Sequence, residues 1–182
     1  MKRPKLLEKK TVFKGFFDVC QDLIQRADGE TFTYTHFVLP VSAVVILAQD
    51  AEGRFVLNRE YRHPIGNDLL GCPGGRLEPG EDPLVGGLRE FQEETGYTSD
   101  EIEQIGVSYP FPGLCNQKIY FLAAKNARPS GNGKQDLDPF EFIQTELKTE
   151  ADLRAEIARG DRVDGLLITA LGYRMLKNSQ SE

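Results

Sequence analysis

The stretch from Gly74 to Gly96 constrains the fold of this chain more than any other part of it. A glycine-rich loop is followed by a segment whose apolar residues recur at the three- and four-residue spacing of an α-helix. Pro83 suits the first turn of a helix, and Gly96 suits the residue that ends one. Glu81 and Asp82 would lie at the positive end of the helix dipole. The pattern predicts a loop and then a helix, and the side chains expected to face the core are Leu84, Leu88, Phe91 and Thr95.

This helix would place the carboxylates of Glu90, Glu93 and Glu94 on one face, because their spacing brings them together. Arg89 comes one turn before Glu93 and could hold it by a salt bridge. Crowded carboxylates repel one another unless a cation neutralises them. Mg²⁺, with Mn²⁺ as the alternative, prefers carboxylate and carbonyl oxygens, and Gly74 could offer its carbonyl with no side chain in the way. On composition alone such a run is more often a solvated helix face, and the alternative is a site for a divalent cation and a phosphate-bearing substrate.

The spacing of the charged residues is more specific than their composition. The fixed positions are Gly75, Glu81, Arg89, Glu90, Glu93, Glu94 and Gly96. This arrangement resembles the Nudix box at every fixed position, with Tyr97 where an aliphatic residue is usual. The resemblance implies a Nudix hydrolase with an α+β fold, in which mixed β-sheets are sandwiched between helices. It also implies that water cleaves a pyrophosphate linkage with the help of Mg²⁺.

Charge and cysteine content indicate which partners and which cellular compartment to expect for the protein. The net charge of −6 argues against a nucleic-acid-binding surface. The only basic stretch lies near the N-terminus and is expected to be a solvated tail, containing Lys2, Arg3, Lys5, Lys9 and Lys10. The three cysteines are odd in number and widely spaced, which favours the reducing cytoplasm. No apolar run reaches the length of a membrane span, so no membrane partner is expected.

Residues 1–40 are expected to form an N-terminal β arm, and residues 41–182 a Nudix hydrolase domain. Short apolar runs between residues 11 and 39 flank the Asp28-Gly29 pair, which is typical of a hairpin turn. An isolated hairpin buries too little surface to be stable. The arm should therefore pack on the main domain or on a second subunit. Together with the habit of the family that the chain resembles, this predicts a symmetric homodimer.

The rest of the chain alternates strand-like and helix-like segments. Strands are expected at residues 41–47, 54–57, 69–73, 105–109, 119–124 and 140–145, and a mobile loop at 126–138. Thr149 could cap a helix over 150–159 that ends at Gly160. A last helix is expected over 164–177, and its inward side chains are predicted to be Leu167, Ile168, Leu171 and Met175.

Outside the box, the chain is similar to ADP-ribose pyrophosphatases and related nucleoside diphosphate sugar hydrolases. The aromatic segment with Phe16 and Phe17 resembles one that stacks on the nucleobase in that group, although either ring could instead be strand core. Glu60 and Arg62, with a tyrosine between them, are similar to a Gln-Tyr-Arg motif whose arginine meets a phosphate. Pro112 lies in a loop that resembles the proline loop downstream of the box and implies substrate contact.

The resemblance also implies the catalytic roles. It assigns the metal to Glu90, Glu93, Glu94 and the carbonyl of Gly74. A carboxylate would take a proton from the attacking water. That base could be Glu93, oriented by Arg89, or an acid on the loop before the last strand, where Asp136 and Asp138 stand with Glu141 beyond.

The predicted reaction is hydrolysis of a small-molecule nucleoside diphosphate sugar such as ADP-ribose, giving a nucleoside monophosphate and a sugar phosphate. One alternative is a Nudix enzyme that acts on nucleoside triphosphates or dinucleotides. Another is a Nudix module that binds a nucleotide sugar without cleaving it, although the complete set of box carboxylates argues against this class.

Overall fold

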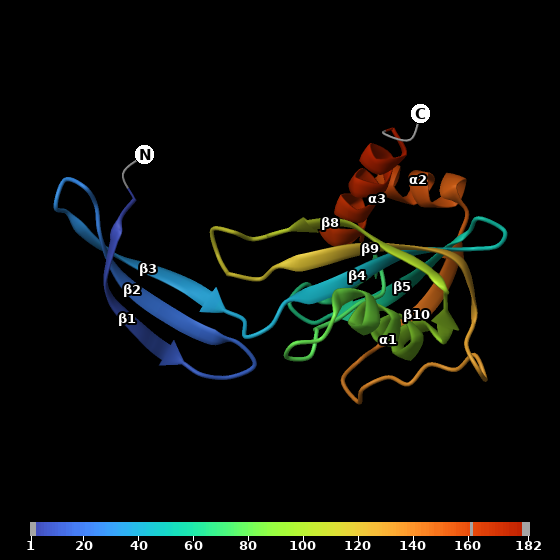
Figure 1. Ribbon diagram of the computed structural model, residues 1–182, viewed down its shortest axis with the longest axis horizontal. Helices are drawn as coiled ribbons and strands as arrows, with labels where there is room; N and C mark the ends of the chain where they lie inside the picture. The colour runs from blue at the N-terminus through green and yellow to red at the C-terminus, as the bar shows by residue number, and fades with distance from the viewer. Residues whose placement is uncertain (1–2, 161, 180–182) are drawn as a thin grey trace. The chain divides into compact units, whose positions relative to one another are not determined.

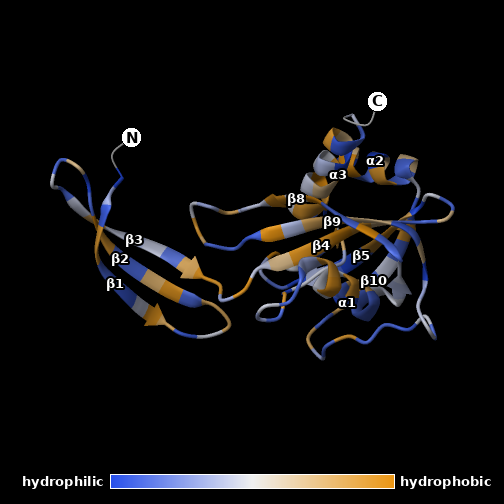
Figure 2. Ribbon diagram, in the orientation of Figure 1, coloured by the Kyte–Doolittle hydropathy of each residue, from blue (hydrophilic) through white to orange (hydrophobic). Residues whose placement is uncertain are grey.

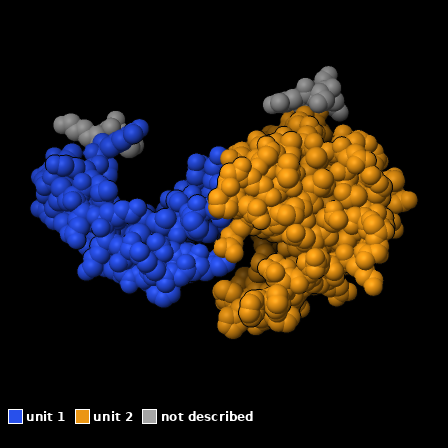
Figure 3. Space-filling view, turned by 60° about the horizontal axis from the view of Figure 1, so that its bottom comes forward, with its two compact units in different colours: residues 1–42, 109–118 blue, residues 43–108, 119–182 orange. Residues whose placement is uncertain are grey.

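The computed structural model describes residues 3–160 and 162–179, and the chain divides into two compact units (Figure 3). Unit 1 consists of residues 1–42 and 109–118, and unit 2 of residues 43–108 and 119–182. The expected arm falls within unit 1, together with the loop 109–118. The proposed role of this arm in a dimer stays a prediction.

Unit 1 is built on a three-stranded antiparallel sheet in the order β1-β2-β3 (Figure 1). Its strands are β1 (Lys5–Phe13), β2 (Asp18–Gln25) and β3 (Thr31–Val38). The turn between β2 and β3 includes Asp28 and Gly29, and the amide of Arg26 donates to the carbonyl of Glu30 at 2.8 Å. The predicted hairpin is therefore confirmed.

The N-terminal basic segment is a strand, so the expectation of a solvated tail is wrong for Lys5, Lys9 and Lys10. Backbone pairing with β2 does not depend on side-chain charge, and Lys9 lies opposite Asp22 in the register. The side chains of β1 nevertheless stay exposed throughout. Lys2 lies outside the described residues.

The loop 109–118 is tied to β3 by hydrogen bonds inside unit 1. The hydroxyl of Tyr34 donates to the carbonyl of Gly113 at 2.6 Å, and the amide of Phe37 donates to the carbonyl of Leu114 at 2.9 Å. The predicted division at residue 40 assigned this loop to the main domain. Its hydrogen bonds instead join it to the arm, from which it is distant along the chain.

Unit 2 contains a seven-stranded sheet and three helices. The strands are β4 (Ala43–Asp50), β5 (Phe55–Arg62), β6 (Asn67–Gly71), β7 (Tyr97–Thr98), β8 (Glu101–Ser108), β9 (Ile119–Pro129) and β10 (Ile143–Lys148). The helices are α1 (Pro83–Thr95), α2 (Glu150–Arg159) and α3 (Gly165–Asn178). The main path runs β10-β5-β4-β9-β7, and only β4 and β9 are parallel neighbours among the paired strands of the described residues. The predicted α+β class with a mixed sheet is confirmed.

The core of unit 2 has two layers because side chains alternate along β4. Val44 and Ile46 belong to one buried cluster with Phe91 of α1. Val45 and Leu47 belong to the other, which includes residues of α2 and α3. The helices therefore cover opposite faces of the sheet, and Figure 2 shows the apolar residues concentrated along its central strands. No described helix is long and apolar enough to cross a membrane.

Helix α1 begins and ends where the sequence indicates. The side chain of Asp82 accepts hydrogen bonds from the amides of Leu84 at 2.9 Å and Val85 at 3.4 Å, and Pro83 opens the helix. Such a cap stabilises a helix by about 1 kcal/mol. Gly96 has a left-handed backbone with φ of 71°, and its amide donates to the carbonyl of Gln92.

The buried face of α1 differs in part from the prediction. Phe91 and Thr95 are buried as expected, but Leu84 is 37% exposed. Gly86 and Gly87 are buried instead, and a Cβ on Gly87 would overlap a side-chain atom of the sheet. These glycines let the helix approach the strands more closely than leucines would.

The last two helices are confirmed in extent, with Thr149 and Asp164 as their N-caps. Two inward residues predicted for α3 are wrong. Ile168 and Met175 are exposed, because they lie about 80–100° around the helix from buried Leu167. The limits of all six strands predicted for the main domain also shift. The observed strands are 43–50, 55–62, 67–71, 101–108, 119–129 and 143–148.

Candidate active site

The side chain of Glu94 lies inside unit 2, with 5% of the residue exposed. Its Oε2 accepts a hydrogen bond from the amide of Gly74 at 2.7 Å and another from Nδ2 of Asn58 at 2.9 Å. These donors come from separate parts of the chain, the turn before the box and strand β5. The carboxylate is thus held on two sides by groups that the sheet brings to it.

The pKa of Glu94 is raised to about 8, chiefly by burial and also by the nearby carboxylates of Glu60, Glu90 and Glu141, while the hydrogen bond from the Gly74 amide opposes the shift. Burial likewise raises the pKa of Glu90 and of Glu60. The acids therefore lie close enough to disfavour one another's ionised forms. A group of this kind is stabilised by a bound cation.

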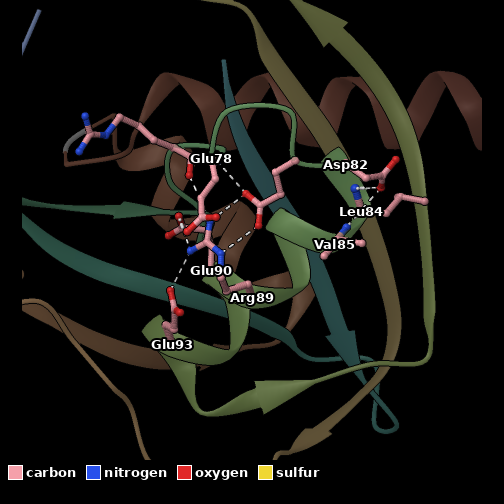
Figure 4. A network of polar contacts seen from close by, with 9 residues as sticks. Glu78, Asp82, Leu84, Val85, Arg89, Glu90 and Glu93 are labelled. Carbon is pink, nitrogen blue, oxygen red and sulfur yellow. Dashed lines mark hydrogen bonds and ion pairs between the residues drawn. The ribbon is translucent and has the colours of Figure 1, made fainter. Parts of the chain in front are cut away.

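Arg89 is the hub of the polar network in Figure 4. Its guanidinium donates to Glu81 at 3.1 Å through both Nε and Nη2, and its Nη1 lies 3.0 Å from both Glu90 and Glu93. Nη2 also donates to the carbonyl of Arg76 at 3.2 Å. The predicted pair with Glu93 is confirmed, and the same side chain also orients two further box acids and the loop.

The glycine turn is required by close packing. Gly74 has φ of 147°, and a Cβ there would overlap the backbone of Val44. A Cβ on Gly75 would overlap the carboxylate of Glu90. The carbonyls on either side of Gly74 are engaged with β4, since Ile46 and Val44 donate to Pro73 and Gly75 at 2.9 Å each.

Two acids that the sequence did not assign to the metal site, Glu60 and Glu141, join this group. Glu60 follows Asn58 by two residues on β5, so both side chains project from the same face. Glu141 lies just before β10, in which Ile143 pairs with Glu60. The alternation of polar residues at the end of β5 was the available signal for Glu60. Nothing in the spacing of Glu141 could have placed it beside the box.

The loop before β10 is docked on the C-terminal end of α1 rather than free of it. The amide of Asp136 donates to the carbonyl of Glu93 at 2.8 Å, and Nε2 of Gln135 donates to the carbonyl of Glu94 at 2.5 Å. The amide of Asp138 donates to the Glu141 carboxylate at 2.9 Å. A hollow of about 610 Å³ lies between the loop and the helix, lined by residues that include Arg89, Glu93, Lys134 and Asp136.

The other predicted substrate residues divide between the two units. Arg62, in unit 2, forms an ion pair with Glu60 at 2.5 Å. Phe16, Phe17 and Pro112 belong to unit 1. Both phenylalanines lie in the turn between β1 and β2 rather than in a strand, and Phe16 is 64% exposed. The rings of Phe17 and Phe37 meet edge to face, with centroids 5.0 Å apart.

The donor chemistry of the cluster fits a hard divalent cation. Its carboxylates are oxygen donors in a buried, mutually repelling group, and Oδ1 of Asn58 has no hydrogen-bond partner within the described structure. No three Asp, Glu, His or Cys side chains of the described residues are gathered closely enough to form a ready-made metal site. Arg89 engages the carboxylates of Glu90 and Glu93 through its Nη1. Cation binding would require some of these contacts to rearrange.

The structure contains the glycine turn, the arginine-clamped acidic helix and the mixed sheet between helices that the resemblance to Nudix hydrolases implies. The chain belongs to the Nudix family, because the NUDIX domain matches residues 39–165. The predicted family and the predicted enzyme class are thereby confirmed.

Relatives span nearly the whole chain. An ADP-ribose pyrophosphatase of Bacillus subtilis is 27% identical over 176 residues, covering 96% of this chain and 94% of that protein. A methanol dehydrogenase activator of Bacillus methanolicus is 30% identical over 182 residues, covering 96% and 97%. A crystal structure of an ADP compounds hydrolase superposes with a TM-score of 0.86 and 21% identity, over 99% of this chain and 97% of the other, and this likeness supports the fold.

Proposed function

We propose that this Nudix hydrolase cleaves the pyrophosphate bond of nucleoside diphosphate sugars such as ADP-ribose, releasing a nucleoside monophosphate and a sugar phosphate. The observation that carries the proposal is the placement of the box acids at the glycine turn: Gly74 donates to the buried Glu94 carboxylate, and the Glu90 carboxylate lies against Gly75. The relation to an ADP-ribose pyrophosphatase along almost the full chain supports this choice of substrate class.

Mg²⁺, with Mn²⁺ as the alternative, would be held by Glu90, Glu93, Glu94 and the carbonyl of Gly74. When bound, such a cation neutralises phosphate charge and lowers the pKa of a coordinated water. Arg89 keeps the carboxylates of Glu90 and Glu93 in fixed orientations, and is a positioning group rather than a proton carrier. Its own charge also offsets the repulsion among the acids.

The general base would be one of the acids beside the proposed metal ligands. Glu93, 42% exposed at its side chain, is open to solvent and oriented by Arg89. Among the loop acids, Glu141 acts electrostatically on Glu90 and Glu94, whereas Asp136 and Asp138 are exposed. We therefore rank Glu141 beside Glu93, and Asp136 and Asp138 behind them.

Substrate recognition would combine charge and stacking. Arg62 would exchange its bond to Glu60 for a phosphate, which its planar donors suit. Phe16 or Phe17 would stack on the base, a contact worth about 1–3 kcal/mol, and Pro112 would border the substrate.

A homodimer formed through unit 1 is part of the proposal. Several large apolar side chains of the unit are exposed, among them Leu6, Val12, Phe13, Phe16 and Phe32. Large apolar side chains that remain exposed are buried when two subunits associate, which favours a dimer. The proposed compartment is the cytoplasm, which the three free thiols Cys20, Cys72 and Cys115 favour.

The test is product release from ADP-ribose, ADP-glucose, GDP-mannose and ATP with Mg²⁺, with Glu93→Gln and Glu94→Gln in parallel. Cleavage of the diphosphate sugars that is lost in the variants is the expected result. Cleavage of ATP alone would make the chain a nucleoside triphosphate hydrolase. Binding of ADP-ribose without product would favour a non-catalytic module.

A further inference from the structure

Asn58 is a polar residue placed in the interior of unit 2. It lies on β5 and is 2% exposed. Gly71 of β6 pairs with it on one side and Thr145 of β10 on the other. Its Nδ2 donates to Oε2 of Glu94 at 2.9 Å. Among the described hydrogen bonds, no other side chain donates to this carboxylate.

Packing alone does not account for an asparagine at this position. The preceding residues of β5, Phe55, Val56 and Leu57, are fully buried and apolar. The Oδ1 of Asn58 is buried and has no hydrogen-bond partner within the described residues. A buried polar atom left in this state lowers stability, and an apolar side chain of similar shape would avoid that loss.

The amide also has a defined orientation. An ionised carboxylate only accepts hydrogen bonds, so Nδ2 rather than Oδ1 must face Glu94 when it is charged. The backbone amide of Gly74 reaches the same oxygen, at 2.7 Å. With Oε2 fixed by two donors, the direction of the other oxygen, Oε1, is fixed as well.

We propose that Asn58 is a positioning residue that holds the Glu94 carboxylate in the orientation needed to bind a divalent cation. The inference rests on the proposed function for the role of the cation, and adds to it a residue outside the Nudix box. Hydrogen-bond partners of metal-binding side chains typically change metal affinity or activity by about 10–100-fold when removed.

Thr145 supplies a matched control on the neighbouring strand. It lies opposite Asn58 in the β5–β10 register, so both side chains project from the same face. Its Oγ1 donates to the backbone carbonyl of Glu94 at 3.5 Å and not to the carboxylate. Thr145 is less buried than Asn58, and Thr145→Val removes a polar group on the same face of the sheet without touching the oxygens that would bind a cation.

The experiment compares Asn58→Leu, Asn58→Ala and Thr145→Val with the unmodified chain. Mn²⁺ binding is measured without substrate by electron paramagnetic resonance, and kcat and KM for ADP-ribose are measured at low and at saturating Mg²⁺. Thermal unfolding without divalent cations reports on the fold. Asn58→Leu keeps a side chain of similar volume and Asn58→Ala removes most of it. If one variant does not fold, the other can still be measured.

We expect the Asn58 variants to bind Mn²⁺ about 10–100-fold more weakly, and their loss of kcat to shrink as Mg²⁺ is raised. Thr145→Val should bind Mn²⁺ as the unmodified chain does. Unchanged Mn²⁺ affinity in a folded Asn58 variant would overturn the inference, and so would an equal loss in Thr145→Val. If the unmodified chain binds Mn²⁺ but cleaves no diphosphate sugar, the proposed function fails while the Mn²⁺ comparison still decides the role of Asn58.

Discussion

Replacing Glu94 by glutamine tests the electrostatics of the site through stability. Burial raises the pKa of this carboxyl from 4.5 to about 8. A carboxyl whose pKa is higher in the folded than in the unfolded chain makes its full contribution to stability below the unfolded pKa. That contribution is lost as the pH rises from about 4.5 to about 8. The unmodified protein should therefore lose stability over this range.

The size of the effect follows from the shift. Each pKa unit corresponds to about 1.4 kcal/mol, so the shift from 4.5 to about 8 gives roughly 3–5 kcal/mol once the group is fully ionised. Glutamine has nearly the same shape, and its oxygen can accept from Gly74 and Asn58. Glu94→Gln should exceed the unmodified protein's free energy of unfolding by less than about 1 kcal/mol at pH 5 and by roughly 3–5 kcal/mol at pH 8.5.

The assay is urea unfolding followed by circular dichroism at both pH values, without divalent cations. Glu52→Gln is the control, because Glu52 lies in an exposed turn and should change the free energy of unfolding by less than about 0.5 kcal/mol at either pH. A difference between Glu94→Gln and the unmodified protein that is the same at pH 5 and pH 8.5 would refute the reasoning. Added Mg²⁺ should stabilise the unmodified protein at pH 8.5 and not the variant.

Three further outcomes follow from the same site. Arg89→Ala should lower kcat at least tenfold with little loss of fold, because the box acids lose their shared partner; activity within twofold would contradict this role. Gly75→Ala should abolish activity, because its Cβ overlaps the Glu90 carboxylate, whereas Gly165→Ala meets no atom and should be neutral in the same assay. Glu60→Gln should lower KM for ADP-ribose severalfold by weakening the ion pair of Arg62, and an unchanged or higher KM would count against a phosphate role for Arg62.

Local signals were sufficient for the box and its helix. Asp82, Pro83 and Gly96 act on neighbouring backbone groups, so they specify where α1 begins and ends in any tertiary setting. The pair between Arg89 and Glu93 is also local, because one helical turn separates the two residues. The chemistry class could be predicted for the same reason.

The exposure of individual helix side chains was harder to predict from the sequence than the ends of the helix. Leu84, Ile168 and Met175 fit the helical pattern of buried residues but are exposed, because the contact surface of each helix depends on how it is placed on the sheet. Gly86 and Gly87 are buried for the same reason. The basic residues of β1 form a strand because β2 offers a partner, not because their composition favours one.

The sequence by itself determined the Nudix box, the loop-to-helix element that carries it and the hydrolase class. Only the tertiary structure decided that Asn58 and Glu60 from β5 and Glu141 from the loop before β10 join Glu94. These residues are far from the box along the chain, and strand pairing together with the packing of α1 on the sheet brings them to it. Helix caps and spacing act over a few residues, whereas the burial and mutual repulsion that raise the pKa of Glu94 depend on groups from the whole sheet.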